Sequence, residues 1–592
     1  MSHCLPTIGL DSNFVSPMRT RTMRTLVVTV LATGLALPIG AQTRTTTLVL
    51  TNGRIVTVDS TRPEAQAVAI AGDRIIAVGT NEEIRRLVTS STQIIDLQGK
   101  LAVPGFIEGH GHFTGLGASK LMLDLTQVKN WDEIVAMVRD AAAKAKPGDW
   151  ILGRGWHQEK WDKAPTPSVE GNPVHSALSA ASPNNPVYLT HASGHASFVN
   201  AKAMEIAGIT SNTPNPAGGE IVRDAQGNAT GLMRETAQRL VSAARARSEA
   251  GRPAEEAESY NRRVVELAGN DALSKGVTSF HDAGSNFQTI DFFKKLADEG
   301  KLPLRLYVMV RREPYARMDS LLPRYRMIGY GNNMLTVRSI KRQIDGALGS
   351  HGAWLFEPYA DLPRSTGLVL ERPSDIDSTA DLAIKYGYQV NTHAIGDRAN
   401  FEVLNIYERA FRANPDKKDL RWRVEHAQHI HPADFPRFKE LGVIASMQGI
   451  HAVSDAPWIP PKLGPVRTPN ESYVFRTLWD LGTVIMNGTD VPVEDANPIA
   501  SFYGMVSRKT RDGTVFVPAQ RLTRAEALKS YTLNGAYGAF QEKDLGSISV
   551  GKLADIVVLS KDIMTIPEEQ IPTARVVYTI LGGKIKYQQT LP

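Results

Sequence analysis

The sequence predicts an α/β chain whose main domain is a (β/α)8 TIM barrel. Apolar runs of strand length alternate with segments of helix length, which is the pattern of a parallel βα fold. Side chains that can bind metal ions stand at the C-terminal ends of several of these runs, and that rim of a barrel collects catalytic groups. The predicted strands are Pro104–Ile107, Val277–Phe280, Leu304–Val310, Thr336–Ile344, Tyr388–Thr392, Arg421–Glu425, Val443–Gln448 and Thr483–Asn487.

The connections between these strands divide the chain. Helical patterns such as Ser374–Tyr386 and Phe401–Asn414 fill the later connections. The first connection is far too long for a βα crossover or a structureless loop, so we predict an inserted subdomain at about 115–272. It has strand-like runs of its own at Trp150–Arg154 and Pro186–Thr190 and a hairpin-like segment at Gly218–Met233. Because it leaves from the rim that bears the candidate ligands, it is placed to wall or cover a site there.

Short strands also occupy both ends of the chain. Turn signals at Asn52-Gly53 and Gly72-Asp73 separate the first set, and Gly582-Gly583 separates the last pair. Neither end is long enough to fold alone. We therefore predict one small β-sandwich built from residues 46–101 and 541–592, with the barrel at 102–540.

The N-terminus is typical of a secretory signal peptide. Arg19, Arg21 and Arg24 precede the apolar run Leu26–Leu37, and small residues follow it, which predicts cleavage near Ala41/Gln42. The run is short for a membrane span, so we expect a periplasmic or secreted protein without a stable membrane anchor after cleavage. The single cysteine, Cys4, precedes the run, so the mature chain would have no disulfide.

Composition excludes some partners. The net charge of +6 is small for 592 residues, and there is no basic block with interleaved aromatic residues. Nucleic-acid binding is therefore not expected, and we expect a small-molecule substrate. The sequence is compatible with a homo-oligomer but does not predict one.

Six candidate metal ligands follow the order of the barrel strands. Two histidines at i and i+2 on an extended segment point the same way, so both imidazoles can bind one ion. One such pair is weak evidence, but the complete ordered set is hard to explain as chance. The set is His110, His112, Lys341, His393, His426 and Asp490.

These residues lie in motifs that resemble the amidohydrolase superfamily. The motifs are HGH at 110–112, the barrel lysine, THAIGD at 392–397, VEHAQ at 424–428, GTDVP at 488–492 and GSISVGKLADIVVLSKD at 546–562. HASFVNAKAM at 195–204, GGEIVRDAQGNATG at 218–231 and IDGALGS at 344–350 resemble the branch that contains N-substituted formamide deformylase. The resemblance covers about residues 46–588. Gly449 departs from it, because the branch is expected to have proline there.

The resemblance implies a binuclear centre. His110, His112 and Asp490 would hold the more buried ion, His393 and His426 the other, and Lys341, carbamylated by CO₂, would bridge the two. Zn²⁺ suits these ligands, and Mn²⁺ or Fe²⁺ would also fit. Asp490 would be the catalytic residue, taking a proton from the attacking water and passing it to the leaving nitrogen. An ordinary lysine that pairs with Asp345 is the alternative for Lys341.

Five further residues are candidates for substrate binding: Trp156, His157, His195, His281 and Asp282. Trp156 and His157 follow a strand of the insertion, and His195 also lies in it, so packing is the alternative for all three. His281 and Asp282 end the second barrel strand, where support of the metal ligands is as reasonable as direct contact. Asp397 is expected only to cap the helix that follows it.

These observations favour a metal-dependent hydrolase that cleaves a C–N bond in an amide, an N-substituted formamide or a cyclic amide. A lactone, ester or phosphoester hydrolase on the same centre is the main alternative. A deaminase is less favoured, because deaminases of this fold commonly lack the lysine and have a glutamate where Asp397 stands. A periplasmic binding protein without turnover is disfavoured by the complete ligand set. Fold alone does not decide among these reactions.

Overall fold

The computed structural model describes residues 45–251 and 253–589. The predicted signal peptide, residues 1–41, lies outside these residues. Within them, no helix combines the length and the apolar character needed to cross a membrane.

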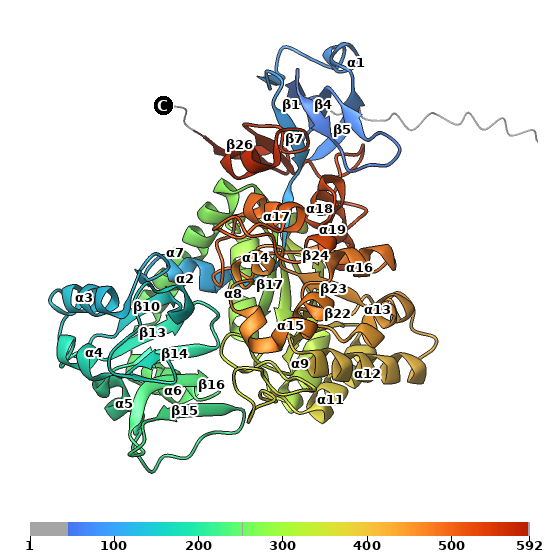
Figure 1. Cartoon of the computed structure of the whole chain (residues 1–592). Helices are drawn as coiled ribbons and strands as arrows, with labels where there is room; N and C mark the ends of the chain where they lie inside the picture. Colours follow the sequence, from blue (N-terminus) through green and yellow to red (C-terminus); the bar gives the residue numbers. More distant parts are fainter. Residues whose placement is uncertain (1–44, 252, 590–592) are drawn as a thin grey trace, which may run out of the picture. The chain divides into compact units, whose positions relative to one another are not determined.

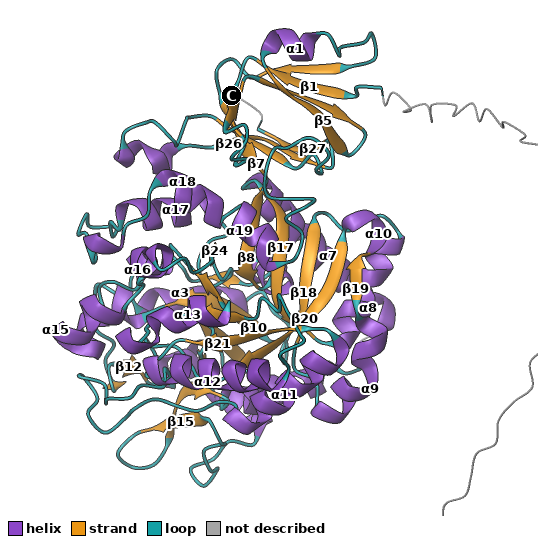
Figure 2. Cartoon of the chain, turned by 90° about the vertical axis from the view of Figure 1, so that its right-hand side faces the viewer, coloured by secondary structure: helices purple, strands orange, loops and turns teal. Residues whose placement is uncertain are grey.

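Eight parallel strands form a nearly closed barrel, as the sequence predicts. Each strand pairs with the next along the chain, from β8 at one edge of the sheet to β24 at the other. The two edges meet where the Asp490 N–H donates a 2.8 Å hydrogen bond to the carbonyl of His110. Figure 2 shows β8, β17, β18 and β20 side by side. The strands are β8 (Phe106–Gly111), β17 (Val277–Ser285), β18 (Arg305–Val310), β20 (Leu335–Gln343), β21 (Gln389–Ala394), β22 (Arg423–His426), β23 (Ile444–Met447) and β24 (Ile485–Asn487).

The first barrel strand differs from its predicted bounds. The prediction Pro104–Ile107 joins the end of β7 (Leu101–Pro104), which belongs to another sheet, to the start of β8. β8 then continues through His110. Likewise β17, β21 and β22 run through His281, His393 and His426, where the predicted strands stop. A polar side chain that points into the barrel does not interrupt the backbone hydrogen bonds between strands. A strand can therefore continue beyond the end of its apolar run.

Helices follow most barrel strands. α11 (Pro373–Tyr386) matches its prediction, whereas α12 (Asp397–Ala413) begins four residues before the predicted Phe401. Gly396 is its N-cap, so Asp397 is the first helical residue and not the cap. Its carboxylate instead accepts a hydrogen bond from the Phe356 N–H at 3.0 Å. Other helices around the barrel are α7 (Ala254–Ser274), α8 (Phe287–Asp298), α9 (Tyr315–Tyr325), α13 (Phe435–Leu441), α15 (Ile459–Glu471), α16 (Phe475–Asp480), α17 (Pro498–Ser507), α18 (Arg524–Ser530) and α19 (Leu533–Gly538).

Both ends of the described chain contribute to one six-stranded sheet, which has the order β27-β26-β25-β7-β2-β3. A second sheet has the order β5-β4-β1-β6. Side chains of both sheets share an apolar core that includes Leu50, Val68, Ile556 and Val558. Strands of the two sheets gather at the top of Figure 2. Their bounds are β1 (Leu48–Thr51), β2 (Arg54–Val56), β3 (Glu64–Ala65), β4 (Ala67–Ala71), β5 (Arg74–Gly79), β6 (Gln93–Asp96), β25 (Ile556–Leu559), β26 (Val576–Leu581) and β27 (Lys584–Gln588).

The segment between β8 and β17 contains its own six-stranded sheet, of order β15-β16-β14-β13-β10-β9. Trp131 and Phe198 pack in its core, with ring centroids 4.7 Å apart. The predicted hairpin is present as β15 and β16, which pair in antiparallel fashion. Figure 1 shows β10, β13, β14 and β16 together in this sheet. The main elements are α2 (Phe113–Ser119), β9 (Leu123–Asp124), α3 (Trp131–Ala142), β10 (Ile151–Trp156), β12 (Asn172–Pro173), β13 (Val187–His191), β14 (Ala196–Val199), α5 (Ala201–Ala207), β15 (Gly219–Arg223), β16 (Ala229–Glu235) and α6 (Gln238–Glu249).

Candidate metal centre

The barrel brings the six predicted ligands together at the C-terminal ends of its strands. His110, His393 and His426 lie on β8, β21 and β22, and the His426 ring centroid is 4.6 Å from that of His110 and 4.4 Å from that of His393. Lys341 on β20 places its Nζ 3.2 Å from Nε2 of His110. Asp490 follows β24, and its Oδ1 lies 3.2 Å from Nε2 of His112. Five of the six are nearly inaccessible, and only His112 is partly exposed.

The tightest grouping differs from the two predicted sets. One ligand atom from each of His110, His426 and Asp490 lies within 4.8 Å of the others, a spacing that could hold one metal ion. The resemblance assigned His110 and Asp490 to one ion and His426 to the other. The structure places these three at the centre of the cluster, with His112 and His393 on either side.

The donor set fits a divalent metal ion. Nε2 of His393 is buried and has no hydrogen-bond partner among the residues that the structure describes, and the buried Oδ1 of Asp490 faces the imidazoles of His110 and His112 at 3.5 and 3.2 Å. Burial lowers the pKa of His110, and it lowers that of His112 to about 4. Both imidazoles are therefore neutral near pH 7, which is the form that binds a metal. Neutral imidazoles with one carboxylate are ligands typical of Zn²⁺ and related ions.

Lys341 has the environment of a reactive amine. Burial lowers its pKa to about 7, and no carboxylate lies within ion-pair distance of it in the described chain. The alternative partner, Asp345, is engaged elsewhere. Its carboxylate accepts hydrogen bonds from the backbone N–H groups of Trp354, Ile395 and Gly396 at 2.8–3.0 Å. An unprotonated amine is the form that can react with CO₂, so these surroundings are compatible with a carbamate.

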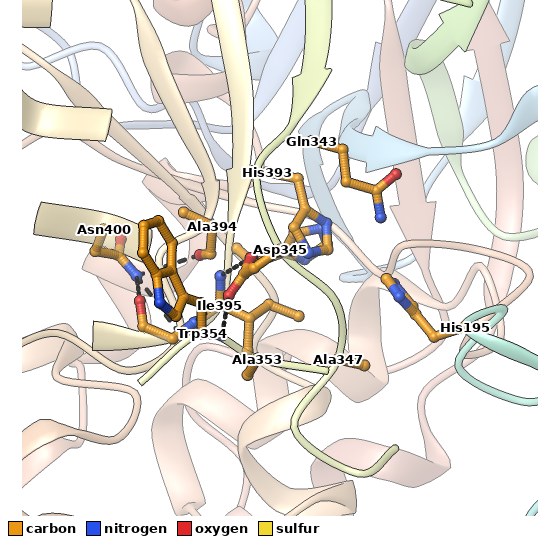
Figure 3. Close-up of polar contacts among 12 residues, drawn as sticks. His195, Gln343, Asp345, Ala347, Ala353, Trp354, His393, Ala394, Ile395 and Asn400 are labelled. Atoms are coloured by element: carbon orange, nitrogen blue, oxygen red, sulfur yellow. Dashed lines mark hydrogen bonds and ion pairs between the residues drawn. The ribbon is translucent and has the colours of Figure 1, made fainter. Parts of the chain in front are cut away.

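Two buried polar side chains orient candidate ligands and a third lies beside one, and the sequence interpretation missed all three in these positions. Glu425 hydrogen-bonds Nδ1 of His110, and Gln448 Oε1 lies 2.9 Å from Nδ1 of His426. Asp345 Oδ1 lies 3.5 Å from Nε2 of His393, and Figure 3 shows the two side chains facing each other. The first two contacts leave Nε2 of each ring for a ligand. The available signal was a charged residue inside an apolar strand, as in RVEH at 423–426, because a buried charge needs a partner.

A small cavity of about 60 Å³ opens at this cluster. His393, His426 and Asp490 line it from the barrel, and His157 and His195 line it from the insertion. Figure 3 shows His195 across from His393, and their ring centroids are 5.4 Å apart. Glu235, which the sequence interpretation also missed, lies 2.8 Å from Nδ1 of His195. Burial alone would lower the pKa of His195, but the Glu235 carboxylate outweighs it and raises that pKa.

The other three predicted substrate-binding residues do not line this cavity. Trp156 is 1% exposed and donates its indole N–H to the Leu189 carbonyl in the core of the insertion. His281 is fully buried beside Tyr307 and Arg423. Asp282 accepts a 3.0 Å hydrogen bond from the Phe113 N–H and thereby holds the start of α2, directly after His112. Asp282 is therefore placed to hold the backbone next to His112, a candidate metal ligand, and not to contact a substrate in this cavity.

Gly449, the departure from the motif pattern, has a structural reason. A Cβ at this position would lie 2.3 Å from the carbonyl oxygen of Ser501, so the close approach of α17 requires glycine. Its N–H also donates to Asn487 Oδ1 at 3.0 Å, a bond that proline could not make.

Known proteins resemble this chain over most of its length. Residues 93–587 match the profile described as "Amidohydrolase family". Protein LONG AFTER FAR-RED 3 of Arabidopsis thaliana is 35% identical over 91% of both chains. N-substituted formamide deformylase of Arthrobacter pascens is 28% identical over 92% of this chain and 98% of its own. An uncharacterized metal-dependent hydrolase of Pyrococcus horikoshii OT3 superposes with a TM-score of 0.69 and 26% identity, over 88% of this chain and 99% of that one.

Proposed function

Since the chain belongs to the amidohydrolase family, we propose that it hydrolyses a C–N bond in an amide, an N-substituted formamide or a cyclic amide. Metal-dependent hydrolysis in general is supported by the family and by its structural relatives. The observation that carries the proposal is the convergence of His110, His426 and Asp490 on one point beside Lys341. The named activity of the deformylase relative supports C–N cleavage over ester cleavage.

In this proposal two divalent ions, with Zn²⁺ preferred, are held by the six candidate ligands. His110, His112 and Asp490 would hold one, His393 and His426 would hold the other, and a carbamate on Lys341 would bridge them. The ions supply Lewis acidity, which lowers the pKa of water and polarises a carbonyl. His110 and Asp490 are assigned to one ion and His426 to the other, yet ligand atoms of all three lie within 4.8 Å of one another. This closeness supports two ions near enough to share a bridging ligand.

The side chains have separate tasks. Asp490 takes the proton of the attacking water and gives it to the leaving nitrogen, a role that its central position allows. Glu425 and Gln448 hold the rings of His110 and His426 with Nε2 inward. His195 and His157 contact the substrate from the insertion, because both line the same cavity as Asp490.

The test combines metal analysis with a substrate screen. Metal-loaded protein should contain close to two divalent ions per chain and hydrolyse at least one N-formyl, N-acyl or cyclic amide faster than a matched lactone. Lys341→Ala should lose one ion and nearly all activity, and short carboxylic acids should restore part of it. Lys417→Ala, on the exposed surface, is the control. Wild-type turnover in Lys341→Ala, or hydrolysis of lactones alone, would contradict the proposal.

We also propose the organisation and location that the sequence suggests. The division into a barrel at 102–540, an insertion at about 115–272 and a domain from both chain ends is supported by three separate apolar cores. Export to the periplasm or medium is supported by the N-terminal sequence alone. The partner is a small-molecule substrate.

A further inference from the structure

A second, larger cavity adjoins the one at the candidate metal centre. Its volume is about 400 Å³, within the usual range of ligand pockets, against about 60 Å³ for the first. Gly349 lines both. The segments 156–160, 191–196 and 347–351 contribute neighbouring residues to each, so the two cavities are adjacent.

Two aromatic side chains bound the space beside Gly349. A Cβ added there would lie 3.7 Å from Nε1 of Trp458 and 3.9 Å from Nε2 of His157. Those two rings are themselves in contact, with centroids 4.6 Å apart. Glycine at this position therefore leaves room for about one methyl group beside two aromatic rings, at the residue that both cavities share.

The charges that line the larger cavity are balanced. Arg234 and Arg364 both pair with Glu170, each at 2.9 Å, and Lys462 pairs with Asp361 at 3.2 Å. The remaining carboxylate, Glu159, is solvent-exposed. A charged ligand group would therefore compete with existing pairs, because no buried charge in this wall lacks its opposite.

The lining of the larger cavity includes neutral polar groups that can still form hydrogen bonds. Gln158 binds Nε2 of His191 through Oε1 at 3.1 Å, and its amide nitrogen has no partner among the described residues. Asn172 donates from Nδ2 to the Glu170 carbonyl at 2.9 Å, and in the described chain its Oδ1 accepts no hydrogen bond. One group donates and the other accepts. Hydroxyl groups suit both kinds of partner, since each hydroxyl donates one hydrogen bond and accepts two.

We propose that the larger cavity binds the nitrogen substituent of the substrate, and that this substituent is an uncharged chain with several hydroxyl groups. The small cavity then receives a compact acyl group of formyl size. This inference rests on the proposed C–N hydrolysis, and it adds the substrate class: N-acylated amino-polyols with a short acyl group.

The test compares two formamides of equal chain length, N-formyl-glucamine and N-formyl-hexylamine. The wild-type enzyme should have a kcat/KM at least tenfold higher for the hydroxylated compound. Asn172→Leu, which removes one acceptor at nearly constant volume, should reduce that ratio about fivefold, since one hydrogen bond contributes about that factor. Leu362→Trp, which fills the cavity from its loop, should abolish the preference. Val466→Trp places the same ring on a 71% exposed position of α15 and should leave the ratio unchanged.

The outcomes separate the two proposals. Hydrolysis of both compounds at equal rates, or a preference that survives Leu362→Trp, overturns the cavity assignment and leaves C–N hydrolysis standing. If neither compound is hydrolysed, C–N hydrolysis fails for this class, and calorimetric titration with glucitol, an uncharged polyol of the same chain length, decides the cavity. Binding that Leu362→Trp weakens and Val466→Trp does not would support the site. No binding of glucitol would overturn it.

Discussion

Asp490 is the residue on which the proposed chemistry depends most. Burial alone would raise its pKa, but the hydrogen bond with His112 and the nearby imidazoles hold that pKa well below its usual range. The group is therefore an anion at the centre of three histidines, and it can bind a metal and accept a proton.

We predict that Asp490→Asn lowers kcat by roughly 10²–10⁴, the usual contribution of a general base, with a smaller change in KM. The substitution keeps the shape and removes the charge. Steady-state kinetics on metal-replete protein, with metal content confirmed by elemental analysis, measure the effect. Asp495→Asn is the control, because that side chain is 61% exposed. An unchanged kcat in Asp490→Asn would assign the proton transfer to another group.

Glu425 is a second single residue on which the site depends, because it hydrogen-bonds the ring of His110. It is fully buried, and the nearby His110, Lys341 and Arg423 side chains hold its pKa far below the usual range despite the burial. We predict that Glu425→Gln weakens metal affinity 10- to 100-fold, as loss of a charged partner of a metal-binding histidine does. Chelator competition measures this, and Glu440→Gln on the exposed surface is the matched control. Equal chelator resistance in the two variants would argue against an orienting role.

Among the elements, β18 of the barrel is tied to the chain just before β25 by a buried ion pair. Arg305 contacts both carboxylate oxygens of Asp555, at 2.7 and 2.9 Å, and Asp555 also accepts the Gly582 N–H. We predict that Arg305→Met lowers the free energy of unfolding by roughly 3–5 kcal/mol, because it leaves a buried carboxylate without its partner. Denaturant unfolding measures it. The double variant Arg305→Met/Asp555→Leu should lose less than the single one; an equal or larger loss would mean that the pair itself provides the stability.

The end of α15 has a different electrostatic character. Burial, with Asp397 nearby, raises the pKa of Glu471 to about 7. A carboxyl whose folded pKa is raised binds more protons in the folded state, so stability falls as pH rises from about 4.5 to about 7. We predict that Glu471→Gln is more stable than wild type at pH 8, by on the order of 2 kcal/mol, and about equal to it at pH 4. Thermal unfolding at the two pH values checks this, and a pH-independent difference would contradict it.

At the scale of the whole molecule, the sequence predicts that the first residues are removed. The arginine-flanked apolar run should direct export, and the mature chain should begin near Gln42. N-terminal sequencing of the protein from its native host checks this. An uncut chain recovered from the cytoplasm would show that the segment is not a signal peptide.

The barrel and the order of its candidate ligands were predictable because both depend on local patterns. Short apolar runs alternate with helical segments, and the candidate ligands stand close to the C-terminal ends of such runs. The strand ends were less predictable. β17 continues past Phe280 to Ser285 because its polar residues face other polar groups in the interior and keep the backbone pairing.

The sequence by itself determined that His110, Lys341, His426 and Asp490 would meet on one rim, because parallel strands in sequence order leave no other arrangement. Only the tertiary structure decided what supports them and what they face. Glu425 meets His110 from a strand more than 300 residues away, and Glu235 meets His195 across two strands of the insertion. The larger cavity likewise forms from the insertion, the loop at 347–364 and α15. No local pattern encodes these contacts, because they depend on how the insertion packs against the barrel and not on the period of either.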